Sequence, residues 1–196
     1  METGLRIIAF AGPAGSGKDT CADELARQIR SLGGVRCEGR GVTVLHAVRR
    51  FALATPLREA CDALGLSSAA TREEKDRPCA DLEGRTGRDL LVALGRAVRE
   101  VGGPGFMTRR FLAAARDWAN IRSRAWAVVS DLRTAEEARL LREAGATLVW
   151  VDRPGDRPDV WLQPEVRAAC DRTLDNSRDL PHLLAQVAAL AGEVVR

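Results

Sequence analysis

The stretch that most constrains this chain is residues 12–20, which read GPAGSGKDT. An apolar run at residues 5–10 comes directly before it, and residues 22–32 carry apolar side chains at helical spacing. A strand, a glycine-rich loop and a helix in this order are the parts of a phosphate-binding P-loop. The spacing from the first glycine to the final glycine-lysine pair is also that of a P-loop. Residues 5–32 therefore predict a nucleotide-binding unit.

The loop itself is suited to hold phosphate groups. Glycines let the backbone bend so that successive N–H groups face an anion, and the following helix adds its positive N-terminal end. Lys18 is predicted to bridge the β- and γ-phosphates of a nucleotide. The alternative, a glycine-rich turn with an ordinary surface lysine, fits the spacing and context less well. The predicted nucleotide-binding residues of the loop are Gly12, Ala14, Gly15, Ser16, Gly17, Lys18, Asp19 and Thr20.

Length and composition favour one cytoplasmic domain. The chain has 196 residues and a net charge of +3, which is too small a bias to predict nucleic-acid binding by itself. It has no tyrosine, and aromatic residues make up only 4%, which disfavours a base-stacking surface. We expect no signal peptide and no membrane span, because no apolar run approaches about 18 residues. Five cysteines without CxxC spacing indicate reduced thiols. The sequence does not set the oligomeric state, and a homodimer is compatible with it.

Strand and helix patterns alternate along the chain, and this predicts an α/β fold. Apolar, β-branched runs indicate strands at residues 5–10, 42–48, 125–130 and 147–151. Apolar stripes indicate helices at residues 17–32, 57–64, 87–101, 106–120 and 134–144, and a last helix from about residue 177 or 180 to residue 194. Thr134 and Glu137 have the spacing of a capping box at the start of one helix. We therefore expect a parallel sheet covered by helices on both faces, with ligands at the carboxyl ends of its strands.

Three segments carry no such pattern. Residues 31–41 are expected to form a glycine-rich link, and residues 152–164 a loop. Residues 67–86 contain a single leucine among polar side chains, so we expect either a solvated loop or a mobile lid.

Two aspartates are candidate metal ligands. Asp19 stands where a P-loop usually has a serine or threonine that binds magnesium, and its carboxylate suits Mg²⁺ directly or through water. The alternative is a helix N-terminal carboxylate favoured by the helix dipole. Asp131 ends an apolar strand, as a Walker-B aspartate does, and the alternative is a residue that leads into the helix after Thr134.

Arginines gather in the middle third of the chain, where they could bind a second phosphate group. The planar guanidinium fork matches phosphate oxygens, so several arginines at one site are typical of small phosphorylated ligands. Most of these arginines are expected to be solvated helix charges. Arg88 and Arg96 are favoured, because both belong to a helix with an apolar stripe, and Arg133 is predicted to face the same crevice as Asp131. Lys18, Arg88, Asp131 and Arg133 are thus the predicted catalytic residues.

These segments, in their order, resemble the phage deoxynucleoside monophosphate kinases, which belong to the P-loop nucleoside-monophosphate kinases. The loop form Ser-Gly-Lys-Asp-Thr is similar to that family's. Further similar segments cover most of residues 5–190. They are Phe51–Ala60, Glu74–Pro78, Gly87–Leu91, Ser130–Arg133, Glu136–Ala138, Val151–Pro154 and Asp175-Asn176.

The resemblance implies a single P-loop kinase domain over residues 1–196, with three αβα layers, an adenylate-kinase-like sheet and a helical lid or acceptor insertion at about 67–120. It implies ATP and Mg²⁺ as cofactors and a nucleoside monophosphate as substrate. It adds Arg58 to the predicted acceptor-binding residues Arg88, Arg96 and Arg133. It also implies that Arg153 borders the donor base or ribose. The central helix departs from the family pattern around Arg96, which leaves the accepted base open.

Other readings remain at this point. The chain is compatible with a P-loop kinase of another small acceptor, such as phosphomevalonate or dephospho-coenzyme A. It is also compatible with a P-loop NTPase that acts as a switch or on nucleic acid. A catalytically inactive nucleotide-binding protein is disfavoured, because Lys18 is present.

Overall fold

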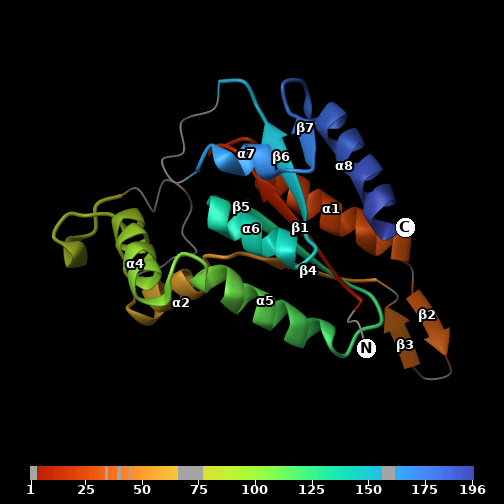
Figure 1. Ribbon diagram of the computed structural model, residues 1–196, viewed down its shortest axis with the longest axis horizontal. Coiled ribbons are helices and arrows are strands. Elements are labelled where there is room, and N and C mark those ends of the chain that lie inside the picture. The colour runs from red at the N-terminus through yellow and green to blue at the C-terminus, as the bar shows by residue number, and fades with distance from the viewer. Residues whose placement is uncertain (1–3, 34, 39–40, 45, 66–76, 156–161) are drawn as a thin grey trace.

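The computed structural model describes residues 4–33, 35–38, 41–44, 46–65, 77–155 and 162–196 (Figure 1). Among these residues, no helix combines the length and the apolar composition that crossing a membrane requires.

A five-stranded parallel sheet forms the centre of the molecule. Its order is β4-β5-β1-β6-β7, so β1, which leads into the P-loop, lies in the middle. The central position buries β1 on both faces, and residues 7–11 are all buried. The five strands are β1 Leu5–Ala11, β4 Ala47–Phe51, β5 Ala125–Leu132, β6 Thr147–Asp152 and β7 Arg172–Asp175.

One face of the sheet is covered by α1 (Lys18–Gly33) and α8 (Leu180–Val195). Leu25 of α1 and Leu183 of α8 pack with Phe10 of β1 in one apolar core. Cys21 lies in the same core, and burial raises the pKa of its thiol to about 12. The helix that carries the P-loop lysine is therefore fixed to the sheet along its length.

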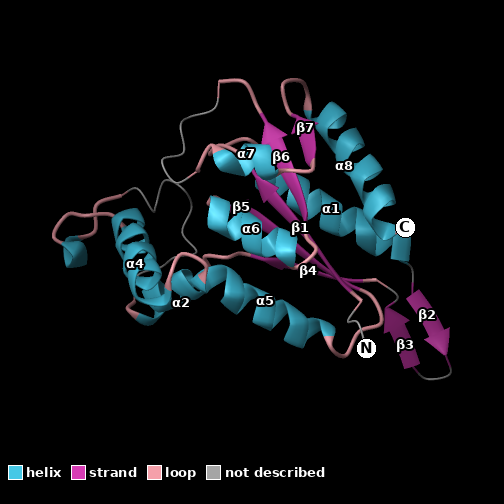
Figure 2. Ribbon diagram, in the orientation of Figure 1, coloured by secondary structure: helices cyan, strands magenta, loops and turns pink. Residues whose placement is uncertain are grey.

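The other face is covered by α5 (Phe106–Ala119), α6 (Ala135–Glu143) and α7 (Glu165–Ala169) (Figure 2). Alternate residues of the strands point to this side, because successive side chains of a strand face opposite ways. Helix α6 begins with the capping box predicted from Thr134 and Glu137. The predicted three-layer αβα arrangement with a parallel sheet is confirmed.

Two further helices, α2 (Thr55–Ala63) and α4 (Gly87–Gly102), lie beyond the carboxyl ends of the strands and pack against each other (Figure 1). A short 3₁₀ turn, η1 (Ala80–Leu82), precedes α4. Of the α4 residues, all of which the structure describes, only Gly95 is buried, and Val101 is 91% exposed. These helices therefore contribute little to the two apolar cores.

Some predicted boundaries were wrong. The expected link at residues 31–41 is instead the end of α1 followed by a hairpin of β2 (Val35–Glu38) and β3 (Gly41–Val44). The strand expected at 42–48 is divided between β3 and β4, and β4 continues to Phe51. The expected loop 152–164 was followed by no predicted strand, yet α7 and the edge strand β7 come next.

Half of the loop or lid predicted at residues 67–86, residues 67–76, lies outside the described residues. Residues 77–86 contain η1 and a bridge between Pro78 and Thr86. The wider lid or acceptor insertion at 67–120 stays a prediction.

Candidate active site

The P-loop wraps closely around its own lysine. Lys18 Nζ donates hydrogen bonds to the carbonyl oxygens of Gly12, at 2.7 Å, and Pro13. Gly12 has φ +144°, and a Cβ at this position would stand 2.5 Å from the carbonyl oxygen of Val151. Only glycine fits there, because both the backbone angle and the neighbouring strand exclude a side chain. The loop and β6 are thus in direct contact.

Two residues that follow strands β6 and β7 contact the P-loop. Asn176, after β7, donates from Nδ2 to the Ser16 carbonyl oxygen at 2.8 Å. Arg153, after β6, donates from Nη1 to the Gly15 carbonyl oxygen at 3.2 Å. Ser16 is fully buried, whereas Thr20 is exposed on α1. Arg153 thus lies beside the predicted donor site, and its contact with the donor base or ribose stays a prediction.

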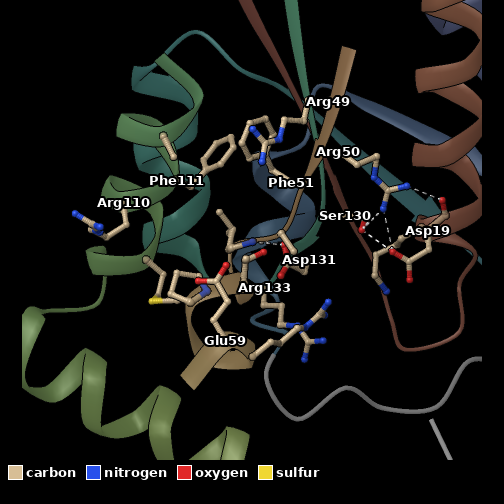
Figure 3. A pocket seen from close by; sticks show the side chains of 18 of the residues that line it. Asp19, Arg49, Arg50, Phe51, Glu59, Arg110, Phe111, Ser130, Asp131 and Arg133 are labelled. Carbon is tan, nitrogen blue, oxygen red and sulfur yellow. Dashed lines mark hydrogen bonds and ion pairs between the residues drawn. The ribbon is translucent and has the colours of Figure 1, made fainter. Parts of the chain in front are cut away.

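A cavity of about 810 Å³ opens from the P-loop toward α2, α4 and α5 (Figure 3). Eight predicted site residues line it: Ala14, Gly15, Lys18, Asp19, Arg58, Arg88, Asp131 and Arg133. They come from the P-loop, α2, α4 and the end of β5. The fold therefore brings the predicted phosphate-binding lysine and three predicted acceptor arginines to one cavity.

Arg96 is the predicted acceptor residue that lies apart from this group. It is exposed on α4 and does not line the cavity. Arg88 and Arg96 are eight positions apart on one helix, and only Arg88, in the first turn, reaches the cavity.

The Asp19 carboxylate is held by two donors. Ser130 Oγ donates to Asp19 Oδ1 at 2.5 Å, and Arg50 Nη2 donates to the same oxygen at 3.3 Å. The side chain is 82% exposed. Arg50 also donates to Ser130 Oγ at 2.8 Å, so the three side chains form a closed triangle (Figure 3).

The carboxylate oxygens of Asp19 fit a magnesium ion that is held partly by a nucleotide. Magnesium usually takes one or two carboxylates together with substrate phosphates and water. In the described part of the chain, no cluster of three or more His, Cys, Asp or Glu side chains could hold a metal by itself. The Asp19 carboxylate beside the P-loop matches the protein's share of such a site.

The Asp131 side chain connects two elements of the cavity wall through hydrogen bonds. Its Oδ1 accepts the backbone N–H of Leu53 at 2.8 Å, and its Oδ2 accepts that of Ala54 at 3.0 Å. Ala54 is the residue before α2. Both carboxylate oxygens thus anchor the start of α2 to the end of β5, and metal binding by Asp131 stays a prediction.

The backbone of Arg133 is held by the capping box of α6. Glu137 is only 2% exposed, and its Oε2 accepts the N–H of Arg133 at 2.9 Å and that of Thr134 at 3.0 Å. Arg99 of α4 approaches the other oxygen, Oε1, at 3.4 Å. One buried carboxylate therefore fixes the segment that presents Arg133 and contacts the α4 helix.

The cavity also has an aromatic wall that the sequence patterns did not reveal. The rings of Phe51 and Phe111 meet edge to face, with centroids 5.3 Å apart, and the Arg49 guanidinium lies 4.9 Å from the Phe51 ring centroid. Arg49, Arg50 and Phe51 line the cavity because β4 continues to Phe51, three residues beyond its predicted end. A correct boundary would have placed them at a carboxyl strand end, where ligands bind. Ser130, Glu59 and Arg110 are further lining residues outside the predicted set.

Comparisons with known proteins support the resemblance seen in the sequence. No family model matches the chain. A protein of Acanthamoeba polyphaga mimivirus with the name "Putative deoxynucleotide monophosphate kinase" is 28% identical over 197 residues, which cover 92% of this chain and 93% of the viral protein. The predicted resemblance to deoxynucleoside monophosphate kinases is thereby confirmed.

Solved structures with a similar fold include APE1195, with a TM-score of 0.49, 16% identity, and coverage of 100% of this chain and 99% of that one. They also include shikimate kinase from Aquifex aeolicus, with a TM-score of 0.42, 15% identity and 96% coverage of both chains.

Proposed function

We propose that this protein transfers the γ-phosphoryl group of ATP to a nucleoside or deoxynucleoside monophosphate. The products are ADP and the corresponding nucleoside or deoxynucleoside diphosphate. The observation that carries the proposal is the shared cavity, in which Lys18 of the P-loop faces the same space as Arg58, Arg88 and Arg133. A donor phosphate site and a cationic acceptor site thus open into one volume. The name of the viral relative supports the same acceptor class.

Phosphoryl transfer depends mainly on positioning and charge neutralisation, and it needs no covalent help from the protein. Lys18 and the P-loop N–H groups hold the β- and γ-phosphates. Arg58, Arg88 and Arg133 hold the acceptor phosphate in line with the γ-phosphorus. An acceptor-phosphate oxygen then forms the new P–O bond while the bond to the ADP oxygen breaks.

Asp19 is the residue that would hold Mg²⁺ against the donor phosphates. The bound ion supplies further neutralisation of the phosphate charge. Ser130 holds the carboxylate in place, because its hydroxyl donates to Asp19 Oδ1.

The aromatic wall suits the base of the acceptor. Phe51 and Phe111 lie on the side of the cavity away from Asp19 (Figure 3), and they line it together with Met107. Aromatic side chains bind flat rings through offset or edge contacts. The arrangement therefore supports a small acceptor with one phosphate and one planar group.

The test is ADP release with ATP and Mg²⁺ against a panel of dGMP, dTMP, dCMP, dAMP and the four ribonucleoside monophosphates, with nucleic acid, phosphomevalonate and dephospho-coenzyme A as comparison additions. We expect strong stimulation by one or two of the monophosphates. Lys18→Ala serves as the control variant and should reduce the rate by about two to three orders of magnitude with an unchanged melting temperature. Release that is independent of every acceptor, or that responds only to nucleic acid, would contradict the kinase and indicate an NTPase. Stimulation by phosphomevalonate or dephospho-coenzyme A alone would replace the acceptor class.

A further inference from the structure

The Arg50 side chain makes contacts that the proposed reaction does not explain. Its guanidinium donates to the Asp19 carboxylate at 3.3 Å, to the Asp19 carbonyl oxygen at 3.2 Å, to Ser130 Oγ at 2.8 Å and to the Asp23 carboxylate. The side chain is 27% exposed and lines the cavity. A cation therefore already sits against the carboxylate that is predicted to hold Mg²⁺.

Two cations compete when they share one carboxylate. Like charges a few ångströms apart repel, and the repulsion is larger near a protein than in bulk water. Arg50 neutralises the Asp19 carboxylate in the nucleotide-free protein. It must lose part of that interaction when the carboxylate binds Mg²⁺ at the donor phosphates.

If Arg50 leaves Asp19, the phosphate group of a bound acceptor is a second possible partner in the same cavity. Arg50 lies on β4, and its side chain stands between those of Phe51 and Asp19 (Figure 3). Arg58, Arg88 and Arg133 line the same cavity. The Arg50 guanidinium keeps the fork that matches phosphate oxygens. Its contact with Asp23 is between partly exposed side chains, at 27% and 71%, and such surface pairs restrain a charge only weakly.

We propose that Arg50 has two alternative partners, the Asp19 carboxylate before the metal–nucleotide complex binds and the acceptor phosphate afterwards. This inference rests on the proposed function. If the inference is correct, binding of the metal–nucleotide complex favours acceptor binding, because the Arg50 guanidinium leaves Asp19 and becomes available to the acceptor phosphate. Ser130 keeps its own hydrogen bond to Asp19 Oδ1 when Arg50 leaves, since its hydroxyl is a separate donor to that oxygen.

The first experiment measures binding of a fluorescent ATP analogue as a function of Mg²⁺ concentration, with no acceptor present. Arg50→Met should lower the Mg²⁺ concentration for half-maximal binding by about fivefold, because a competing cation is removed. Arg49→Met is the matched control: it removes the same charge from the neighbouring residue, which lies over Phe51 and lines the same cavity. It should leave the Mg²⁺ dependence unchanged. An unchanged or higher Mg²⁺ requirement in Arg50→Met would overturn the inference.

Asp23→Asn gives a second, milder variant in case Arg50→Met does not fold. It loosens the hold on Arg50 without removing the guanidinium. We expect a twofold to threefold higher Mg²⁺ requirement, since Arg50 then pairs with Asp19 alone, on the order of a surface ion pair. A lower requirement in this variant would contradict the competition.

The second experiment measures acceptor affinity with a non-hydrolysable ATP analogue, with and without Mg²⁺, for the monophosphate that gives the highest rate in the panel. In the unaltered protein, Mg²⁺ should tighten acceptor binding, and Arg50→Met should lose most of that gain. Equal gains in both proteins would refute the second partner of Arg50. The Mg²⁺ titration uses no acceptor, so a failed acceptor panel would refute the proposed function and leave the competition between Arg50 and the metal to be judged separately.

Discussion

The proposed donor and acceptor halves of the cavity are built differently. The P-loop stands between the central strand β1 and helix α1, whose buried residues Cys21, Leu25 and Ile29 are completely inaccessible to solvent. The acceptor half is carried by α2 and α4, and of all α4 residues only Gly95 is buried. The P-loop thus takes its geometry from the core, whereas α2 and α4 are placed by a few polar contacts, such as those of Asp131 at the end of β5 and Glu137 at the start of α6.

The largest expected effect concerns the difference in packing between α1 and α4. Leu25→Ala should lower the free energy of unfolding by about 2–5 kcal/mol, because it removes a fully buried side chain from α1. Leu91→Ala, in half-buried surroundings on α4, should cost only about 1 kcal/mol. Urea unfolding followed by circular dichroism measures both variants. Equal losses would show that α4 is packed as firmly as α1 and would remove the contrast.

The second largest effect on stability is expected at Asp131, which links the end of β5 to the start of α2. Asp131→Asn should reduce stability by about 1–3 kcal/mol, because its amide cannot accept both the Leu53 and Ala54 N–H groups. The acceptor KM should rise while ATP affinity stays the same. If Asp131 is a metal ligand instead, the Mg²⁺ requirement will rise and the acceptor KM will not.

Two arginines on one helix test the acceptor site. Arg88→Ala should raise the acceptor KM about tenfold, since it removes a charged donor that faces the cavity. Arg96→Ala is the matched control on α4 and should change the KM little, because Arg96 is exposed away from the cavity. Steady-state kinetics at saturating ATP separates them. A similar rise for both would place the acceptor over a wider surface of α4.

The smallest effect is on pH dependence. Hydrogen bonds from Thr86 hold the pKa of Asp89 below its ordinary value at the start of α4. The carboxylate therefore stabilises the helix above its ordinary pKa, and this contribution is lost as the pH falls through the lowered value. Hydrogen exchange of α4 amides should increase over that acidic range before that of α1. Asp89→Asn should remove the difference in pH response, and an unchanged response would assign it to another group.

The donor half could be predicted because its signals are local. The spacing of residues 12–20 fixes a loop, and the preceding and following apolar patterns fix β1 and α1. The capping box of Thr134 and Glu137 is likewise a short-range pattern, and the structure confirms it. Lys18, Asp19 and Asp131 consequently fall at one cavity, as expected.

The missed features depend on distant partners. Strand β7 has four residues, of which Leu174 is the buried apolar one, and it exists because it pairs with β6 at the sheet edge. The β2–β3 hairpin uses a segment whose glycines suggested only a link. Arg50 and Ser130 are 80 positions apart in sequence, and no spacing rule brings their side chains together at Asp19.

The carboxylate of Asp131 has a consequence for how this protein could diversify. It holds α2 through backbone N–H groups, which every residue except proline provides, so the anchor makes few demands on the sequence of α2. Side chains on α2 and α4 can then change to suit another acceptor while the point from which α2 departs stays fixed. Acceptor preference can therefore change through substitutions on α2 and α4 while the P-loop and the start of α2 keep their positions.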